Sequence, residues 1–259
     1  MPSRNPNDLP TRAMILAAGL GTRLRPLTDT TPKCMMPIGG RPLLEYTLRW
    51  MRQFGVTEIV INLHHLPRMV TNYFGDGTAW GVRIRYSVEE QPLGTAGGVR
   101  RMRRFFDAPF FVWYGDNLST CLLDRLWACH RTKGGIGTIA LFHRRDAVHS
   151  GIVGLDRDHR VKRFLEKPKP REVFTHWVNA GILVLEPEIV EMIPSRRSVD
   201  FGRDVFPELI ARNARLYGYR MSKREKLYWI DRPEDLRRLE TRWARLGDEF
   251  SLAGNPGKP

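Results

Sequence analysis

The sequence predicts an α/β protein with a mainly parallel, doubly wound sheet and a smaller antiparallel portion in its second half. Short apolar runs alternate with helical patterns over the first 142 residues, which is typical of strand–helix–strand units whose strands lie parallel. Later residues show strand–turn–strand patterns instead. The 259 residues are 42% apolar, which is ample for a large core.

Five apolar runs are the expected strands of the first half, at residues 13–17, 58–62, 82–86, 110–114 and 137–142. Two stretches between them, residues 41–55 and 122–135, carry apolar side chains three and four positions apart and contain glycine stops, as helices do. Helices then cover both faces of the sheet. Ligands bind such sheets beyond the carboxyl ends of the strands.

The second half is expected to extend the same domain. Residues 150–168 fit two strands around a polar turn, residues 179–187 a further strand, and residues 232–246 a closing helix. No repeat, low-complexity tract or long linker divides the chain. We therefore predict one domain over residues 12–246 with two parts that meet near residue 142, preceded by a disordered leader at 1–11 and followed by a disordered tail at 247–259.

A net charge of +14 favours anionic partners, although many arginines at residues 99–106 and 235–246 also fit solvated helix faces. Nucleic acid is the less favoured partner, because neither a recognition helix nor basic residues interleaved with aromatic ones are evident. No apolar stretch suits export or membrane insertion. The cysteines Cys34, Cys121 and Cys129 form no CxxC pair, so we predict a cytoplasmic protein without a zinc site.

The first predicted strand runs directly into LAAGLGTRLRPLTDTTPKCMMPIGG, residues 16–40. Gly19 and Gly21 let backbone N–H groups turn toward a phosphate without interference from a Cβ. Arg23 and Lys33 add fixed positive charge beyond what a turn requires. The stretch lacks both the Gly-Lys-Ser/Thr of a Walker A loop and the third glycine of a dinucleotide fingerprint. It predicts an anion cradle of another kind.

This stretch resembles the N-terminal signature of the sugar-1-phosphate nucleotidylyltransferases, or NDP-sugar pyrophosphorylases, in which G-x-G-T-R, a spacer and P-K occur in that order. Further motifs follow in family order: EEQPLGTAGG, YGDN, FLEKP, VNAGI, DFGRDVFPEL and WIDRPEDL. The resemblance covers nearly all of the chain apart from its ends. It implies a Rossmann-like fold of the nucleotide-diphospho-sugar transferase type, with a nucleotide-binding part at about 12–142 and a sugar-binding and closing part at about 143–246.

The reaction that the resemblance implies is attack by a sugar 1-phosphate oxygen on the α-phosphorus of an NTP, with release of pyrophosphate. The nucleophile is already an anion, so catalysis must hold two highly negative substrates in line and screen the charge at phosphorus. Backbone donors, Arg, Lys and Mg²⁺ do this. The implied partners are an NTP, a sugar 1-phosphate and Mg²⁺, with no nucleic acid and no membrane; homo-oligomerisation is left open.

The resemblance also assigns site residues. The backbone of Leu20, Gly21 and Thr22 resembles a triphosphate cradle, with Arg23 on the leaving pyrophosphate and Lys33 bridging phosphates. The implied sets are, for nucleotide binding, Ala18, Gly19, Leu20, Gly21, Thr22, Arg23, Glu89, Gly94 and Thr95; for catalysis, Arg23, Lys33, Asp116 and Lys167; for sugar binding, Glu166, Lys167 and Asn179; and for the metal, Asp116 and Asp231.

Several of these positions have an ordinary structural alternative. Asp116 ends a buried run where Mg²⁺ would compensate its charge, but it could instead cap a helix. Lys33 could be a surface-loop lysine, and Glu166 with Lys167 an exposed ion pair. Asp231 departs from the family pattern, since the loop between it and Pro-Glu-Asp is two residues shorter. Its carboxylate is then displaced, or it caps the closing helix.

Glu89 lies where the family places a base-reading side chain, and a carboxylate can accept both N1–H and N2–H₂ of guanine. This favours GTP, and EEQPLGTAGG resembles the mannose-1-phosphate guanylyltransferase branch. A glucose-1-phosphate thymidylyl- or uridylyltransferase is the close alternative. A regulatory homologue that binds NDP-sugar without turnover is disfavoured, because Arg23, Lys33 and Asp116 are all present.

Overall fold

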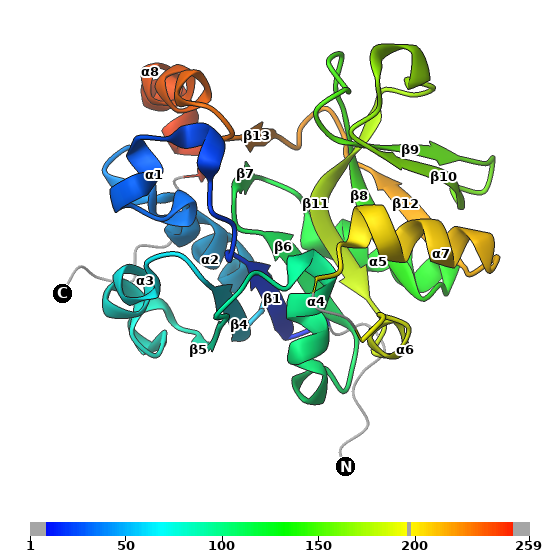
Figure 1. Cartoon of the computed structure of the whole chain (residues 1–259), viewed down its shortest axis with the longest axis horizontal. Coiled ribbons are helices and arrows are strands. Elements are labelled where there is room, and N and C mark those ends of the chain that lie inside the picture. Colours follow the sequence, from blue (N-terminus) through cyan, green and yellow to red (C-terminus); the bar gives the residue numbers. More distant parts are fainter. Residues whose placement is uncertain (1–8, 196–197, 251–259) are drawn as a thin grey trace.

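The computed structural model describes residues 9–195 and 198–250, and within it a nine-stranded sheet forms the centre of the molecule (Figure 1). Four strands form its parallel part, in the spatial order β6, β1, β4, β5. They are β1 (Arg12–Leu16), β4 (Glu58–Leu63), β5 (Arg83–Val88) and β6 (Phe110–Tyr114). The four predicted strand runs of this region are therefore confirmed, with shifts of a residue or two at their ends.

The rest of the sheet continues beyond β6 and is mainly antiparallel. Its strands are β8 (Gly137–His143), β9 (Gly151–Leu155), β10 (Val161–Glu166), β11 (Trp177–Leu185) and β12 (Leu216–Arg220). Strand β8 runs in the same direction as β6, as expected, but β11 is inserted between them and is antiparallel to both. Strand β12, which the sequence did not predict, pairs with β8 in parallel.

Helices cover both faces, which confirms the doubly wound arrangement. One face carries α2 (Leu43–Gln53), α3 (Pro67–Phe74) and α5 (Leu123–Lys133); the other carries α4 (Gly94–Arg101), α6 (Glu188–Glu191), α7 (Phe206–Ala211) and a π-helical turn, η6 (Phe201–Val205). Strand β1 shows why two cores form. Ala13 and Ile15 lie in one apolar cluster and Met14 in the other, because successive strand side chains point to opposite faces.

A third apolar cluster joins the C-terminal helix α8 (Pro233–Phe250) to the segment after β1. Leu24, Ile38 and Tyr46 pack there against Leu236 and Leu239 of α8. Figure 1 shows α8 beside α1 (Leu27–Thr30), on the far side of the molecule from the β9–β10 hairpin. Two small sheets complete this region: β2 (Pro37–Ile38) with β3 (Arg41–Pro42), and β7 (Asn117–Ser119) with β13 (Leu227–Trp229).

The helical order extends further at the C-terminal side than the boundary predicted from the sequence. Helix α8 continues to Phe250, so residues 247–250 are helical, while residues 251–259 of the predicted tail lie outside the described residues. Residues 9–11 of the predicted leader also pack: Pro10 is buried and the Thr11 carbonyl accepts hydrogen bonds from the N–H groups of Thr57 and Glu58. Residues 1–8 lie outside the described residues. No described helix has the length and apolarity needed to cross a membrane.

Short 3₁₀ turns connect the main elements. They are η1 (Thr22–Leu24), η2 (Lys33–Met35), η3 (Thr78–Trp80), η4 (Arg103–Phe105) and η5 (Pro170–Glu172). The first two follow β1, which pairs with β4 on one side and β6 on the other. The loops after β1 and β6 therefore meet at a topological switch point, where open α/β sheets bind ligands. The Gly115 N–H donates to the Leu16 carbonyl at 2.9 Å and ties the two loops together.

Candidate active site

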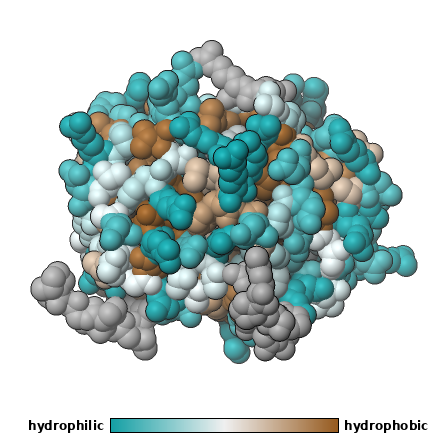
Figure 2. Space-filling view, turned by 90° about the horizontal axis from the view of Figure 1, so that it is seen from below, coloured by the Kyte–Doolittle hydropathy of each residue, from teal (hydrophilic) through white to brown (hydrophobic). Residues whose placement is uncertain are grey.

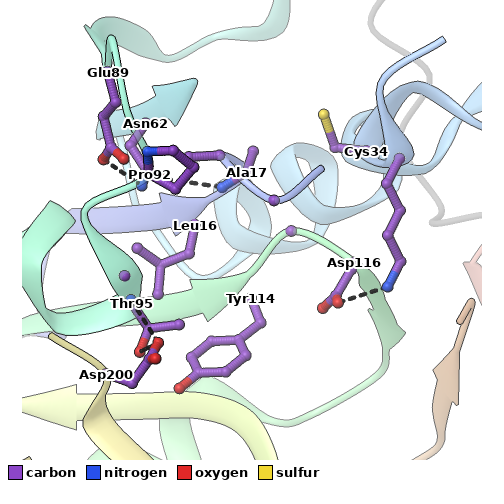
Figure 3. Close-up of a pocket in the computed structure, with 15 residues that line it drawn as sticks. Leu16, Ala17, Cys34, Asn62, Glu89, Pro92, Thr95, Tyr114, Asp116 and Asp200 are labelled. Carbon is purple, nitrogen blue, oxygen red and sulfur yellow. Dashed lines mark hydrogen bonds and ion pairs between the residues drawn. The ribbon is translucent and has the colours of Figure 1, made fainter. Parts of the chain in front are cut away.

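Two cavities open at this switch point. The first has a volume of about 230 Å³ and lies beyond the carboxyl ends of β1 and β6. The second, of about 310 Å³, lies toward β9, β10 and β11. Thr95, Tyr114, Asp116 and Asp200 line both cavities, so the two spaces are adjacent. Figure 3 shows the first cavity, with Glu89 and Asn62 at one side and Asp116 at the other.

The glycine-rich loop after β1 presents unused backbone donors. Gly21 has the left-handed φ of 61°, and a Cβ there would lie 2.8 Å from the Thr28 methyl carbon, so only glycine fits without strain. Gly19 has nothing within 4 Å of its Cβ position and lies open at the first cavity. Among the described residues, no acceptor pairs with the backbone N–H groups from Gly19 to Arg23. Such a row of free donors is suited to an anion.

The predicted cradle residues are divided between the two cavities. Ala18 and Gly19 line the first cavity and Arg23 lines the second. Leu20, which is 43% exposed, and its neighbours at 21–22 are not among the residues that line either space. The loop thus runs along the edge of both cavities.

Asn62, at the end of β4, organises the base of the first cavity, and the sequence did not single it out. Its side-chain oxygen accepts the Ala17 N–H at 2.9 Å, and its Nδ2 donates to Glu89 Oε1 at 2.8 Å. Glu89 Oε2 accepts the Leu93 N–H at 2.9 Å. Both residues are almost fully buried. Glu89 therefore joins its own loop to β4 through its two oxygens, and a base-reading role would use its remaining lone pairs.

Lys33, on η2, lies between two carboxylates from distant parts of the chain. Its Nζ is 2.8 Å from Asp116 Oδ2 and 2.8 Å from Asp231 Oδ1. Arg23 Nη2 lies 3.0 Å from the same Asp231 oxygen. Burial acts to lower the pKa of Lys33, but Asp116 and Asp231 outweigh it and raise the pKa above its usual 10.5. Lys33 is therefore a fixed cation at neutral pH.

The surroundings of these residues exclude three of the structural alternatives. Lys33 is only 12% exposed and is no surface-loop lysine. Asp116 is followed by strand β7, so it caps no helix. The carboxylate that caps the start of α8 is Asp235, whose Oδ2 accepts the N–H groups of Asp231 at 3.2 Å and Arg232 at 2.9 Å. The short loop therefore still brings the Asp231 carboxylate to Lys33.

Glu166, Lys167 and Asn179, predicted to bind the sugar, all line the second cavity. Glu166 is part-buried, and burial raises its pKa above the usual 4.5, while Lys167 and Arg203 act in the opposite direction. Lys167 is exposed and has a left-handed φ of 50°, with its N–H donated to the Ser150 carbonyl at 3.2 Å. No ion pair between Glu166 and Lys167 is found in the described structure, so the exposed-pair alternative is wrong.

An irregularity in β11 aims Asn179 at this cavity. The pairing with β8 shifts between Asn179 and Leu183, where Gly181 has a φ of 71°. Asn179 Oδ1 accepts the Gly181 N–H at 2.9 Å. This bond leaves the side-chain NH₂ group as a donor, for which the Tyr114 hydroxyl is a neighbouring acceptor.

Asp200 joins the two cavities and is a second residue that the sequence did not single out, although it opens the DFGRDVFPEL motif. Its Oδ1 accepts hydrogen bonds from the N–H and the hydroxyl of Thr95 at 3.1 and 3.2 Å. Gly94 must be glycine, because its φ is 79° and a Cβ would lie 2.5 Å from the Val199 carbonyl oxygen. The predicted residues Gly94 and Thr95 thus form a backbone turn that is fastened to Asp200.

The Nucleotidyl transferase family model matches residues 12–239. The chain belongs to the nucleotidyl transferase family. A UTP–glucose-1-phosphate uridylyltransferase from Synechocystis sp. is 38% identical over 234 residues, which cover 85% of this chain and 59% of that protein. A mannose-1-phosphate guanylyltransferase from Mycobacterium tuberculosis is 36% identical over 251 residues, covering 95% of this chain and 68% of that protein.

A solved structure shows the same fold. It is a candidate glucose-1-phosphate thymidylyltransferase from Bacillus anthracis in complex with sucrose, with a TM-score of 0.80 at 21% identity, and the match covers 95% of this chain and 97% of that chain. The present chain spans about 59–68% of the length of the two curated relatives above.

Two carboxylates of this chain, Asp116 and Asp231, have the arrangement of a partial cation site. Asp116 and Asp231 both contact the same ammonium group, so their oxygens already converge on positive charge. No cluster of three or more His, Cys, Asp or Glu side chains suited to a metal occurs in the described part of the chain. Mg²⁺ commonly takes one or two carboxylates and completes its shell with substrate phosphates and water. The donor set therefore fits Mg²⁺ better than a metal that needs an all-protein cage.

Proposed function

We propose that this nucleotidyl transferase moves a nucleotidyl group from an NTP to a sugar 1-phosphate and releases pyrophosphate. The observation that carries the proposal is the placement of Lys33, a largely buried cation that lines the first cavity and is held by two carboxylates, of which Asp116 lines both cavities. One cavity suits the nucleotide and the other the sugar. The reacting phosphates of both substrates would then come together next to Lys33.

Each group at the junction has a distinct electrostatic role in this proposal. The free backbone N–H groups of residues 19–23 donate to the triphosphate, and Arg23 neutralises the departing pyrophosphate. Lys33 contacts phosphate oxygens and screens charge at the α-phosphorus. Asp116 and Asp231 would hold Mg²⁺, which when bound supplies further neutralisation of the phosphates. Because the acceptor is already an anion, no general base is assigned.

The second cavity provides groups for the sugar 1-phosphate. The Lys167 ammonium would bind its phosphate, while Glu166 accepts from and Asn179 donates to the sugar hydroxyls. The raised pKa of Glu166 reflects a partly desolvated carboxyl group, which hydrogen-bonds a polar ligand more strongly than a solvated one. These three side chains define the acceptor side of the reaction.

GTP and mannose 1-phosphate are the substrates we propose first. The guanylyltransferase relative from Mycobacterium tuberculosis and the Glu89 carboxylate beside the first cavity support this choice. Glucose 1-phosphate with UTP or dTTP is the second candidate. It is supported by the Synechocystis relative and by the finding that both Glu89 oxygens already accept protein hydrogen bonds.

The test is Mg²⁺-dependent pyrophosphate release across a grid of GTP, dTTP, UTP, CTP and ATP against the 1-phosphates of mannose, glucose and N-acetylglucosamine. We expect release with GTP and mannose 1-phosphate. Release in another combination would keep the reaction and overturn the assignment of the base or sugar. A grid without release, together with retained binding of an NDP-sugar, would instead support a non-catalytic regulatory homologue.

The matched variants for this assay are Lys33→Ala and Lys162→Ala. Lys33→Ala should lower kcat by about 10²–10³-fold, the usual effect of removing one group that stabilises transition-state charge. Lys162, which is exposed on β10 and lines neither cavity, should tolerate the change without loss. Equal activity of the two variants would exclude the role proposed for Lys33, provided both have the wild-type far-UV circular dichroism spectrum.

A further inference from the structure

A third cavity, of about 410 Å³, lies between α8, β13 and the loop that joins β8 to β9. Apart from Arg23 and Asp231, no residue that lines this cavity has a role in the function proposed above. Arg23 and Asp231 line it as well as the second cavity, so the two spaces meet at the reaction centre. Arg23 therefore borders both the reaction centre and the third cavity.

The charge of this cavity is strongly positive for its size. Five arginines line it, against three aspartates, and they are Arg23, Arg144, Arg232, Arg238 and Arg242. Two of the aspartates are already engaged: Asp231 by Lys33 and Arg23, and Asp235 by backbone N–H groups. The third, Asp146, is more than half exposed and only 4.0 Å from Arg144.

One face of helix α8 contributes the two arginines of this cavity that have no carboxylate partner among the described residues, Arg238 and Arg242. Asp235, Arg238, Leu239 and Arg242 line the cavity at spacings of three, one and three residues, which places them side by side on a helix. Within the described part of the chain, no carboxylate lies within 4.0 Å of Arg238 or Arg242. Arg237, one position earlier, instead pairs with Glu234 at 3.1 Å and does not line the cavity.

Like charges gathered around one space repel each other, and a multivalent anion between them removes that cost. Guanidinium groups present planar forks that match phosphate oxygens, often with two hydrogen bonds each. The wall opposite α8 is held in place, because the Arg144 guanidinium lies over the Trp229 ring at 4.5 Å and the backbone N–H of Arg144 donates to the His176 carbonyl. The cavity is therefore preorganised for an oligophosphate.

We propose that the third cavity binds inorganic pyrophosphate as it leaves the reaction centre. This inference rests on the proposed function, which makes pyrophosphate the product beside Arg23. Arg23 contacts both spaces and passes the anion from one to the other. Arg238 and Arg242 then hold it away from the α-phosphorus, which clears the reaction centre for the next NTP.

The test compares Arg238→Ala and Arg242→Ala with Arg237→Ala, the neighbouring arginine outside the cavity. Isothermal titration calorimetry gives the dissociation constant for pyrophosphate, and steady-state assays give its product-inhibition constant and the KM for the NTP. We expect each cavity variant to weaken pyrophosphate by about tenfold in both measurements, with the KM for the NTP changed less than twofold. Arg237→Ala should match the wild type in all three.

Two results would overturn the inference. One is a pyrophosphate dissociation constant in the cavity variants equal to that of Arg237→Ala. The other is a rise in the KM for the NTP as large as that of the inhibition constant, since the arginines would then hold the triphosphate tail. If the wild type catalyses no transfer but the cavity variants alone lose pyrophosphate binding, the proposed function fails and the anion site stands. Melting curves confirm that each variant is folded.

Discussion

Glu166 occupies a space that exists only because two glycines face it. A Cβ at Gly151 or at Gly202 would lie 2.6 Å from Glu166 Oε2, well inside contact distance. Gly151 begins β9 and Gly202 belongs to the π-helical turn, so residues far apart in the sequence leave room for one carboxylate. The position of this proposed sugar-binding group is therefore set by what its neighbours lack.

Gly202→Ala should displace Glu166 from the second cavity. We expect the KM for the sugar 1-phosphate to rise about tenfold, the KM for the NTP to change little, and stability to fall by roughly 1–3 kcal/mol from overpacking. Steady-state kinetics and urea unfolding measure these changes. In a Glu166→Ala background the same substitution should have a much smaller kinetic effect, because the displaced group is gone; an undiminished effect would contradict the interpretation.

At the scale of elements, α8 connects stability to the reaction centre. Trp243 packs edge-on against Tyr46 with ring centroids 4.9 Å apart and stacks on Phe250 at 5.9 Å. Gly39 makes room for it, since a Cβ there would collide with the indole ring. The helix begins two residues after Asp231, so its docking also determines where that carboxylate lies.

Trp243→Ala should loosen α8 and lower activity with it. Loss of a large aromatic side chain from a packed cluster costs about 3–5 kcal/mol, and we expect kcat to fall because Asp231 is held less firmly. Urea unfolding and hydrogen exchange of the α8 amides measure the effect. Arg245→Ala, at an exposed position of the same helix, should change neither the free energy of unfolding nor kcat. Equally small changes in Trp243→Ala would show that α8 docks by other contacts.

Helices α2 and α3 are joined through one buried acid. Glu45 of α2 is 1% exposed and accepts hydrogen bonds from Arg41 at 2.6 Å, Arg49 at 2.8 Å and the Tyr73 hydroxyl of α3 at 2.7 Å. Burial raises the pKa of Glu45, but the bonds from Arg41, Tyr73 and Arg49 outweigh it, so that the pKa lies below the usual 4.5. The ionised form is therefore the stabilising one.

Glu45→Gln should lower stability by about 2 kcal/mol at pH 7, since hydrogen bonds to a charged group are lost. A carboxyl group whose pKa is lower in the folded state than in the unfolded state stabilises the fold at pH values above the unfolded-state pKa. This stabilisation is lost as the pH falls through the folded-state pKa. The difference from wild type should thus be largest at neutral pH and shrink below about pH 4.5. Urea unfolding from pH 3 to 7 tests this, with exposed Glu240→Gln as the control; a difference independent of pH would refute it.

At the scale of the whole molecule, the cationic residues behind the net charge of +14 lie both on exposed faces and around cavities. Figure 2 shows hydrophilic residues spread over the face at the bottom of Figure 1, with smaller apolar areas between them. Cations gather around cavities at the carboxyl ends of the strands, at Lys33, Arg23 and the α8 arginines, and also around a cavity beside the start of β1 that is lined by five arginines. Positive charge inside clefts attracts anionic substrates more effectively than charge on a convex surface.

Salt should therefore weaken the binding of the NTP and of pyrophosphate. We expect the KM for the NTP to rise several-fold between roughly 0.05 and 0.5 M NaCl, because the screening length falls from more than 10 Å to a few ångströms. A thermal melt at each salt concentration separates screening from unfolding. Random duplex DNA should compete only at the weak level of non-specific binding, about 10⁻⁴–10⁻⁶ M; tighter competition would favour the nucleic-acid alternative.

Local sequence patterns predict much of this architecture. The apolar runs that became β1, β4, β5 and β6, and the helical spacing of α2, α5 and α8, reflect contacts between each segment and one core. The glycine-rich stretch likewise has its free donors and left-handed Gly21 because of its own composition. Such features follow from neighbouring residues and are therefore available to sequence reasoning.

Other features are set by the tertiary structure alone, because they depend on which distant segments of the chain come into contact. The insertion of β11 between β6 and β8 and the hydrogen bonds of Asn62 and Asp200 have no local signature. The sequence by itself determined the fold class, the family and most candidate residues. Only the folded chain decided that Lys33 would lie between Asp116 and Asp231, since burial and charge partners are set by long-range packing.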